Sequence, residues 1–295
     1  MFKYLAFVLI YRLLGWLPTA AAYFIAARAA TLVYYLRPRL RRNVQANIRV
    51  IMGPDTDPAQ VRAKAKEAFR NLAFYYADLL QMPRLNVAKF YENNLTTHNL
   101  HYVLEAVSSG RGVVVASAHL GNPELVLQAA GAIGIRALGI TEPLKPKRLS
   151  DFIHRLRESK GQTFRPVSLS TMKEALRWLS EGRAVSILCD RDIQRTGVPM
   201  PFLGHEVRLP VGAAHLALRT DAVLIPMFCR RTHGKHFEVY TEPPIEMTRT
   251  GNEAADALAN TQKVVAYIEK YLRMDPGQWM VLDRFWEQPG REKSP

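Results

Sequence analysis

The sequence contains only two cysteines, and its first 54 positions contain no acidic residue. Cys189 and Cys229 both fall in expected strands, and their spacing fits neither a zinc knuckle nor a disulfide framework. This excludes a small disulfide-stabilised fold and indicates a reducing compartment for the body of the protein. Low-complexity linkers and internal repeats are also missing, and 295 residues can bury a large core. The prediction is one large α/β domain, or a main domain with a smaller helical piece.

The basic charge is concentrated at the N-terminus. The formal net charge is +14, which favours anionic partners such as nucleic acid, a membrane surface or an acidic ligand. Residues 1–54 hold eight of the basic residues: Lys3, Arg12, Arg28, Arg37, Arg39, Arg41, Arg42 and Arg49. Residues 4–36 of the same segment form the most apolar stretch of the chain. A nucleic-acid arm is rarely so apolar, so we expect an anionic bilayer surface as partner and no nucleic acid.

Arg12, Pro18 and Arg28 interrupt this apolar stretch. Its longest charge-free run, residues 13–27, is shorter than the roughly 20 apolar residues that a spanning helix needs. We therefore expect two amphipathic helices in the bilayer interface, with the RPRLRR cluster against anionic headgroups. A signal peptide and an ordinary core hairpin are the alternatives.

The expected domain bounds are residues 1–54 for the membrane-associating helices, 55–287 for the α/β domain and 288–295 for a polar, frayed tail. Within the body, strands alternate with helices, which predicts a mostly parallel central sheet covered by helices. We expect helices at residues 54–82, 98–109, 123–132, 146–159, 171–181, 211–220 and 253–273, and strands at residues 113–118, 136–141, 163–167, 184–189, 223–229 and 237–241.

A histidine and a glutamate lie five positions apart in VVVASAHLGNPEL. His119 follows a strand that is apolar on both faces, at the sheet edge where open α/β sheets bind ligands. Asn122 is a good N-cap and Pro123 suits the first helical position, so Glu124 falls in the first helical turn. The tight loop between them can fold the Glu124 carboxylate back towards the His119 ring.

Such a pair would act as a base and its orienting group. A carboxylate that accepts a hydrogen bond from one imidazole nitrogen fixes the tautomer and stabilises the charged ring, as deprotonation of a hydroxyl requires. In the structural alternative, Glu124 complements the helix dipole and His119 is a satisfied strand-end residue. Because G-x-S-x-G does not occur in the sequence, covalent catalysis from a nucleophile elbow is not expected.

The H-x4-E arrangement of His119 and Glu124 resembles the H-x4-D/E motif of the lysophospholipid acyltransferase superfamily. Within it, the chain is most similar to the bacterial lipid A biosynthesis and phosphatidylinositol mannoside acyltransferases. The resemblance covers nearly the whole chain: residues 41–48 (RRNVQANI), the HLGNPE block, residues 155–161 (RLRESKG), 188–204 (LCDRDIQRTGVPMPFLG), 208–228 (RLPVGAAHLALRTDAVLIPMF) and 278–286 (QWMVLDRFW).

The resemblance implies transfer of a fatty acyl chain from a thioester donor, acyl-CoA or acyl-ACP, to a hydroxyl of a glycolipid or lysophospholipid. His119 would be the general base and Glu124 its partner, without a metal, a further cofactor or an acyl-enzyme. Arg157 matches the family's arginine shortly before a glycine, here Gly161, and would lie near the donor or the developing oxyanion. A solvated helical face is the alternative for Arg157.

Asp190, Arg191 and Asp192 follow the expected strand at 184–189 and would share the sheet edge with His119. Because three charges are costly to bury unpaired, they either form a structural Asp/Arg network or serve substrate binding. His215 is expected in a core or groove, and no chemistry is assigned to His205, His233 or His236.

Together these features predict an acyltransferase held peripherally or monotopically on the cytoplasmic face of a bacterial plasma membrane. Two alternatives remain: a non-catalytic lipid-binding or lipid-transport protein, and an esterase or thioesterase that uses His119 to activate water.

Overall fold

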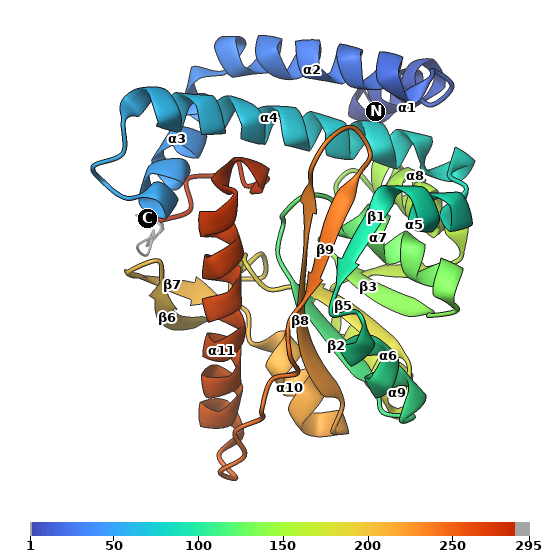
Figure 1. Ribbon diagram of the computed structural model, residues 1–295, viewed down its shortest axis with the longest axis vertical. Coiled ribbons are helices and arrows are strands. Elements are labelled where there is room, and N and C mark those ends of the chain that lie inside the picture. The colour runs from blue at the N-terminus through green and yellow to red at the C-terminus, as the bar shows by residue number, and fades with distance from the viewer. Residues whose placement is uncertain (1, 287–295) are drawn as a thin grey trace.

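The computed structural model describes residues 2–286, and within them seven strands form one mostly parallel sheet (Figure 1). The sheet order is β1-β9-β8-β2-β5-β3-β4, and only the pairing of β8 with β9 is antiparallel. The bounds are β1 (Leu95–His98), β2 (Val113–Ser117), β3 (Ala137–Thr141), β4 (Thr163–Pro166), β5 (Ala184–Leu188), β8 (Val223–Arg231) and β9 (Phe237–Thr241). The expected α/β class is confirmed.

The central strand β2 positions the candidate histidine. All five of its residues are buried, as the β-branched run predicts, and β5 and β8 flank it in parallel. Ser117 at the end of β2 pairs with Leu188 at the end of β5. The residues that follow these two strands therefore leave the sheet side by side at its carboxyl edge.

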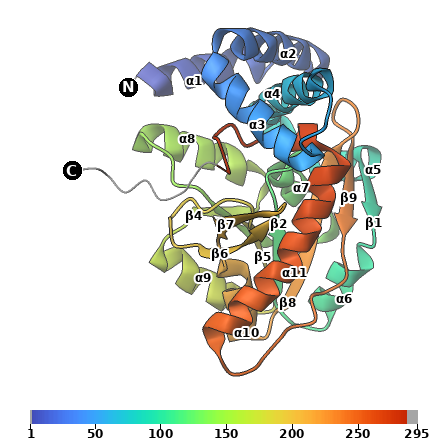
Figure 2. The same cartoon turned by 90° about the vertical axis from the view of Figure 1, so that its left-hand side faces the viewer.

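Helices cover both faces of the sheet (Figures 1 and 2). The alternate side chains of β2 point to opposite faces, so that Val114 packs in one core cluster and Val115 in another. One face carries α9 (Leu169–Ser180), α10 (Gly212–Thr220) and α11 (Glu253–Met274), and the other carries α5 (Val87–Asn94), α6 (His101–Ser108) and α7 (Pro123–Ala129).

The N-terminal segment lies as a helical layer above the carboxyl edge of the sheet (Figure 2). The layer comprises α1 (Phe2–Leu14), α2 (Thr19–Leu36) and α3 (Pro38–Met52) of that segment, together with the long α4 (Pro58–Gln81) that follows it. The sequence predicted two helices before residue 54, and the structure adds α3, which contains most of the RPRLRR cluster. Pro38 occupies the first turn of α3 and Gly53, at φ +100°, ends it, so both ends carry ordinary helix signals.

Helix α2 leaves much of its apolar surface uncovered. Among the described residues, it is the one helix whose length and composition would allow it to cross a membrane, with 18 residues, a mean hydropathy of 1.2 and 28% of them buried. Its exposed large apolar side chains are Phe24, Ile25, Leu32, Val33, Tyr35 and Leu36, and exposed apolar side chains of α1 and the turn after it are Leu5, Leu9, Ile10, Leu13 and Trp16.

Several elements differ from the sequence-based prediction. Helix α5 lies where neither a helix nor a strand was predicted. Residues 95–98 form the short edge strand β1, which was not predicted. The helix predicted at 98–109 starts only at His101, as α6. A separate hairpin, β6 (Val198–Phe202) and β7 (His205–Leu209), was not predicted, because Pro199 and Pro201 argue against a central strand. Residues 288–295, the predicted tail, lie outside the described residues, and the proposed domain bounds remain a prediction.

Candidate active site

His119 stands two residues after β2, and its backbone is held on two sides. The His119 N–H donates to Asp190 Oδ2 at 3.0 Å. The His119 carbonyl accepts from the Met280 N–H at 3.0 Å. These bonds fix the His119 backbone at the carboxyl edge of the sheet without involving the helix that follows.

Asp190 is the carboxylate that contacts the imidazole. It follows β5, is fully buried, and accepts a hydrogen bond from His119 Nδ1 at 2.8 Å and from Trp279 Nε1 at 2.7 Å. Burial disfavours the charged carboxylate, but the His119 ring and these donors outweigh it and lower the pKa of Asp190. Asp190 therefore accepts as a carboxylate and selects the His119 tautomer that carries its proton on Nδ1.

The second ring nitrogen of His119, Nε2, makes no hydrogen bond to any residue in the range 2–286. The ring is 22% exposed and lines a cavity of about 1160 Å³ beside Glu124, Arg157 and Asp192. Most of the cavity wall is apolar and comes from α1, α4, α8 (Lys147–Arg157) and the loops at the sheet edge. A proton-accepting nitrogen thus faces a large apolar chamber.

The expected contact between Glu124 and His119 is not formed. Among the described residues, no hydrogen bond or ion pair joins them, and Glu124 instead holds Arg157 in a two-point ion pair, with Nε donating to Oε2 at 2.8 Å and Nη2 to Oε1 at 2.7 Å. Glu124 does lie in the first turn of α7, as predicted, with Asn122 as N-cap. The helix directs the carboxylate towards α8 because the chain has already turned away from the histidine.

Arg157 lies in the cavity wall and is 7% exposed, so the alternative of a solvated helical face is wrong. Its Nη2 also donates to the Tyr75 hydroxyl at 3.2 Å, while Nη1 is buried without a partner among the described residues. Burial opposes the charge, but Glu124 and Tyr75 more than compensate and raise the pKa of Arg157. Arg157 is therefore a fixed cation with one donor nitrogen, Nη1, that is unused among the described residues.

Arg191 and Asp192, the other predicted site residues, contact parts of the chain outside residues 190–192. Arg191 lines the cavity and reaches Asp283 at 3.2 Å, and Asp192 accepts from the N–H groups of Thr196 and Gly197 at 3.1 and 2.8 Å. The three charges therefore pair with other parts of the chain, Arg191 with Asp283 and with Glu142 at 3.8 Å, and their role in substrate binding stays a prediction. His215 also lines the cavity, whereas His233 and His236 stack on one another in the turn between β8 and β9.

Sequence reasoning missed Tyr75 and Trp279. Tyr75 lies in the run NLAFYYADLL of α4, where nothing distinguishes it from core aromatic residues. Trp279 was noted only within a family-like segment, and its contact with Asp190 joins residues 89 positions apart. Within residues 2–286, no group of three or more His, Cys, Asp or Glu side chains has an arrangement suited to a metal ion.

Comparison with known proteins identifies the family of the chain. The family described as bacterial lipid A biosynthesis acyltransferase matches residues 1–288. A phosphatidylinositol mannoside acyltransferase of Mycobacterium tuberculosis is 27% identical over 289 residues, covering 92% of this chain and 86% of that protein. A protein of the same name from Mycolicibacterium smegmatis is 28% identical over 255 residues, covering 84% of this chain and 79% of its own length. The chain therefore belongs to the bacterial lipid A biosynthesis acyltransferase family and is an acyltransferase that acts on lipids.

Proposed function

We propose that the protein moves a fatty acyl chain from a thioester donor, acyl-CoA or acyl-ACP, to a hydroxyl of a membrane glycolipid or lysophospholipid, with His119 as general base. The observation that carries the proposal is the 2.8 Å hydrogen bond between His119 Nδ1 and Asp190, which leaves Nε2 facing the apolar cavity. We assign to Asp190 the orienting role that the sequence suggested for Glu124.

In this mechanism, His119 Nε2 takes the proton of the acceptor hydroxyl as the oxygen attacks the thioester carbonyl. The new C–O bond creates a tetrahedral oxyanion, and the C–S bond then breaks. The leaving thiolate takes the proton back from the His119 imidazolium, so the enzyme ends unchanged. Asp190 stabilises the imidazolium throughout, in the way that a triad carboxylate does.

Arg157 is suited to stabilise negative charge in the same cavity. Its unpartnered Nη1 can donate to the donor or to the developing oxyanion, and its charge is held in place by Glu124. An acyl-enzyme through Cys189, which also lines the cavity, is disfavoured because burial raises the pKa of that thiol to about 12.

The cavity supports a substrate pair larger than one small molecule. Its volume of about 1160 Å³ exceeds the roughly 300–1,000 Å³ of ordinary ligand pockets, and its walls are mainly apolar. Because acceptor and product are both lipids, we place the enzyme on the cytoplasmic face of the plasma membrane. The exposed apolar side chains of α1 and α2 and the basic charge of residues 1–54 support an interfacial anchor on anionic lipid.

The central test is transfer of radiolabelled palmitate from palmitoyl-CoA, and separately from palmitoyl-ACP, to a panel of bacterial lipids. We expect a labelled lipid with the wild type, none with His119→Ala, and an unchanged yield with His101→Ala, a control on the exposed start of α6. Undiminished labelling with His119→Ala would refute the general base. Release of free fatty acid without an acceptor would point to the esterase or thioesterase alternative.

The anchor is tested by flotation with phosphatidylglycerol vesicles. Replacing Leu9, Leu13 and Trp16 with Gln removes exposed apolar side chains of α1 and its following turn without touching the cavity wall. We expect less protein to float with the vesicles, and no change for Leu104→Gln, which is 43% exposed on α6. Equal flotation of all three proteins would contradict an anchor built from α1.

A further inference from the structure

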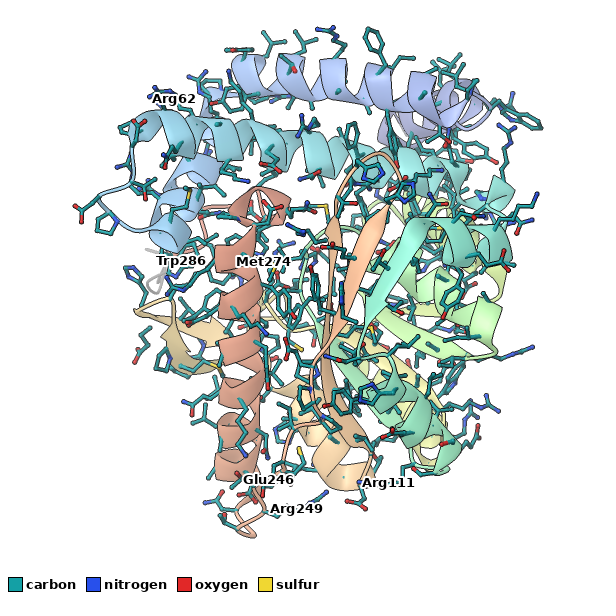
Figure 3. The ribbon with its side chains drawn as sticks, in the orientation of Figure 1. Arg62, Arg111, Glu246, Arg249, Met274 and Trp286 are labelled. Atoms are coloured by element: carbon teal, nitrogen blue, oxygen red, sulfur yellow. The ribbon has the colours of Figure 1, made fainter. Side chains whose placement is uncertain are left out.

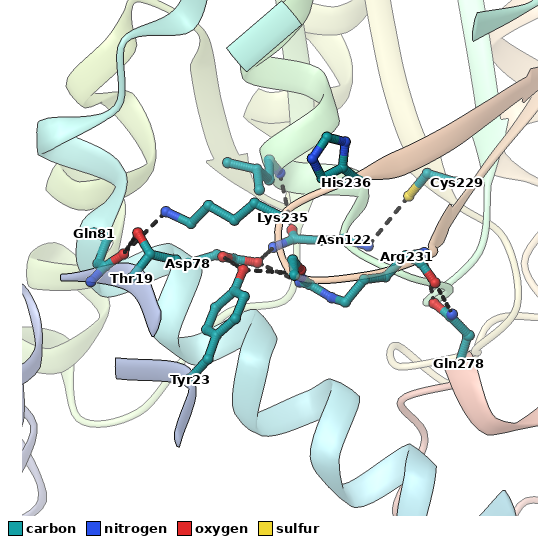
Figure 4. A network of polar contacts seen from close by, with 12 residues as sticks. Thr19, Tyr23, Asp78, Gln81, Asn122, Cys229, Arg231, Lys235, His236 and Gln278 are labelled. Atoms are coloured by element: carbon teal, nitrogen blue, oxygen red, sulfur yellow. Dashed lines mark hydrogen bonds and ion pairs between the residues drawn. The ribbon is translucent and has the colours of Figure 1, made fainter. Parts of the chain in front are cut away.

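A second buried carboxylate, Asp78 of α4, connects three separate parts of the fold (Figure 4). It is 1% exposed, and it accepts hydrogen bonds from the hydroxyl of Tyr23 in α2, from the guanidinium of Arg231 at the end of β8, and from the Asn122 side chain at 2.9 Å. Arg231 balances the charge and also donates to Tyr23 and to the Gly234 carbonyl. The negative charge of Asp78 and the positive charge of Arg231 therefore cancel, and hydrogen bonds join all four side chains.

Asn122 brings this cluster to the candidate active site. Its Oδ1 accepts from the Leu125 N–H at 3.0 Å and caps α7, while its Nδ2 donates to Asp78. Its own N–H points to Cys229 Sγ at 3.3 Å, and the residue is 1% exposed. An N-cap needs only an oxygen acceptor, so the donation to Asp78 is a further restraint on the start of this helix.

Glu124 is the site residue that this restraint reaches. It lies two positions after Asn122 in the first turn of α7, and its two-point contact with Arg157 depends on where that turn sits. His119 is held separately, by Asp190 and Met280. A shift of α7 would therefore disturb the pair of Glu124 and Arg157 and leave the histidine in place.

We propose that Asp78 is a positioning residue that acts through Asn122 on Glu124. Because Tyr23 of α2 also donates to Asp78, the position of α2 affects the position of α7 through the same carboxylate. The effect on rate rests on the function proposed above, whereas the effect on the mobility of α7 does not. A buried ion pair is a weak contributor to net stability, which leaves positioning as the better account of why Asp78 and Arg231 are buried here.

The test uses Asn122→Ser, which keeps a good N-cap and removes the amide Nδ2 that donates to Asp78, leaving only a shorter hydroxyl. Asn86→Ser is the matched control, because Asn86 caps α5 through the Lys89 N–H and its side chain bonds no buried acid within residues 2–286. Hydrogen exchange should become faster in peptides covering residues 119–129 for Asn122→Ser, and only near residues 87–94 for Asn86→Ser. Unchanged exchange in 119–129 would overturn the proposal whether or not the enzyme transfers acyl chains.

Kinetics then test the route through Glu124. We expect Asn122→Ser to lower kcat about 10-fold with KM changed less than about twofold, and to have less than about a twofold further effect in a Glu124→Gln background. A merely structural role would give the same loss in both backgrounds, and that result would overturn the route. If the wild type transfers no acyl group but exchange behaves as expected, the proposed function fails and the positioning role stands.

Tyr23→Phe tests the link to α2. It removes one hydroxyl and keeps the ring stacked on Phe74 at a centroid distance of 4.5 Å, so the helix retains its packing. Exchange should rise in residues 119–129 although Tyr23 has no hydrogen bond to them. If hydrogen exchange changes only in α2 and α4, Tyr23 does not help to position α7, and that part of the proposal is wrong.

Discussion

The substitution Asp190→Asn tests the central assignment. During attack, the proton arrives on His119 and places a positive ring next to the Asp190 carboxylate, with Nδ1 and Oδ1 2.8 Å apart. With charge centres about 4 Å apart and an effective dielectric constant of about 20, the attraction is about 4 kcal/mol. Losing it corresponds to about a 10³-fold lower rate. The amide also offers one oxygen in place of two, so it cannot satisfy His119 and Trp279 as the carboxylate does.

The assay is transfer of radiolabelled palmitate, with kcat and KM measured separately. We expect kcat to fall by about 10³-fold for Asp190→Asn, with a smaller change in KM. Asp221→Asn is the matched control: Asp221 is 78% exposed at the opposite edge of the sheet, where it bonds Arg111 and Arg249, both labelled in Figure 3. Nearly full activity of Asp190→Asn, together with a 10³-fold loss for Glu124→Gln, would refute the assignment and restore Glu124 as the orienting residue.

Three further predictions follow from the contacts of the site. Trp279→Phe removes a hydrogen bond to a charged group, worth about 1.5 kcal/mol, and should lower kcat about 10-fold without unfolding the protein. Arg157→Leu leaves Glu124 buried without its cation and should lower the free energy of unfolding by about 3–5 kcal/mol in urea titrations, a loss that Glu124→Gln should partly reverse. Because burial raises the pKa of Cys189 to about 12, iodoacetamide at pH 8 should label it only after denaturation, and labelling of the native enzyme would contradict its burial.

The sequence pointed to both carboxylates of the site, Glu124 and Asp190, but did not show which basic side chain each one contacts. The apolar run before His119 and the charged residues after residue 189 correctly predicted one shared sheet edge. Which carboxylate meets the imidazole depends on β2 and β5 being neighbours, with Ser117 opposite Leu188, and residues 71 positions apart carry no local signal of that pairing. The hairpin of β6 and β7 is local and was missed for a different reason. Pro199 and Pro201 argue against a strand, and the positive φ values of its turn residues, Leu203 and Gly204, are visible only in the backbone.

The spacing of His119 and Glu124 does not bring the two side chains into contact, and a turn between them explains where each one points. Between them, Gly121 adopts φ +62° so close to the Cys229 carbonyl that a Cβ would lie 2.5 Å from its oxygen, and Asn122 then caps α7. The chain therefore turns sharply after the strand and starts a helix, which leaves the histidine beside Asp190 and carries the glutamate to Arg157. The five-residue interval in this protein thus separates two polar pairs at the same cavity: His119 with Asp190, to which we assign the proton transfer, and the ion pair of Glu124 with Arg157, which holds a cation in place.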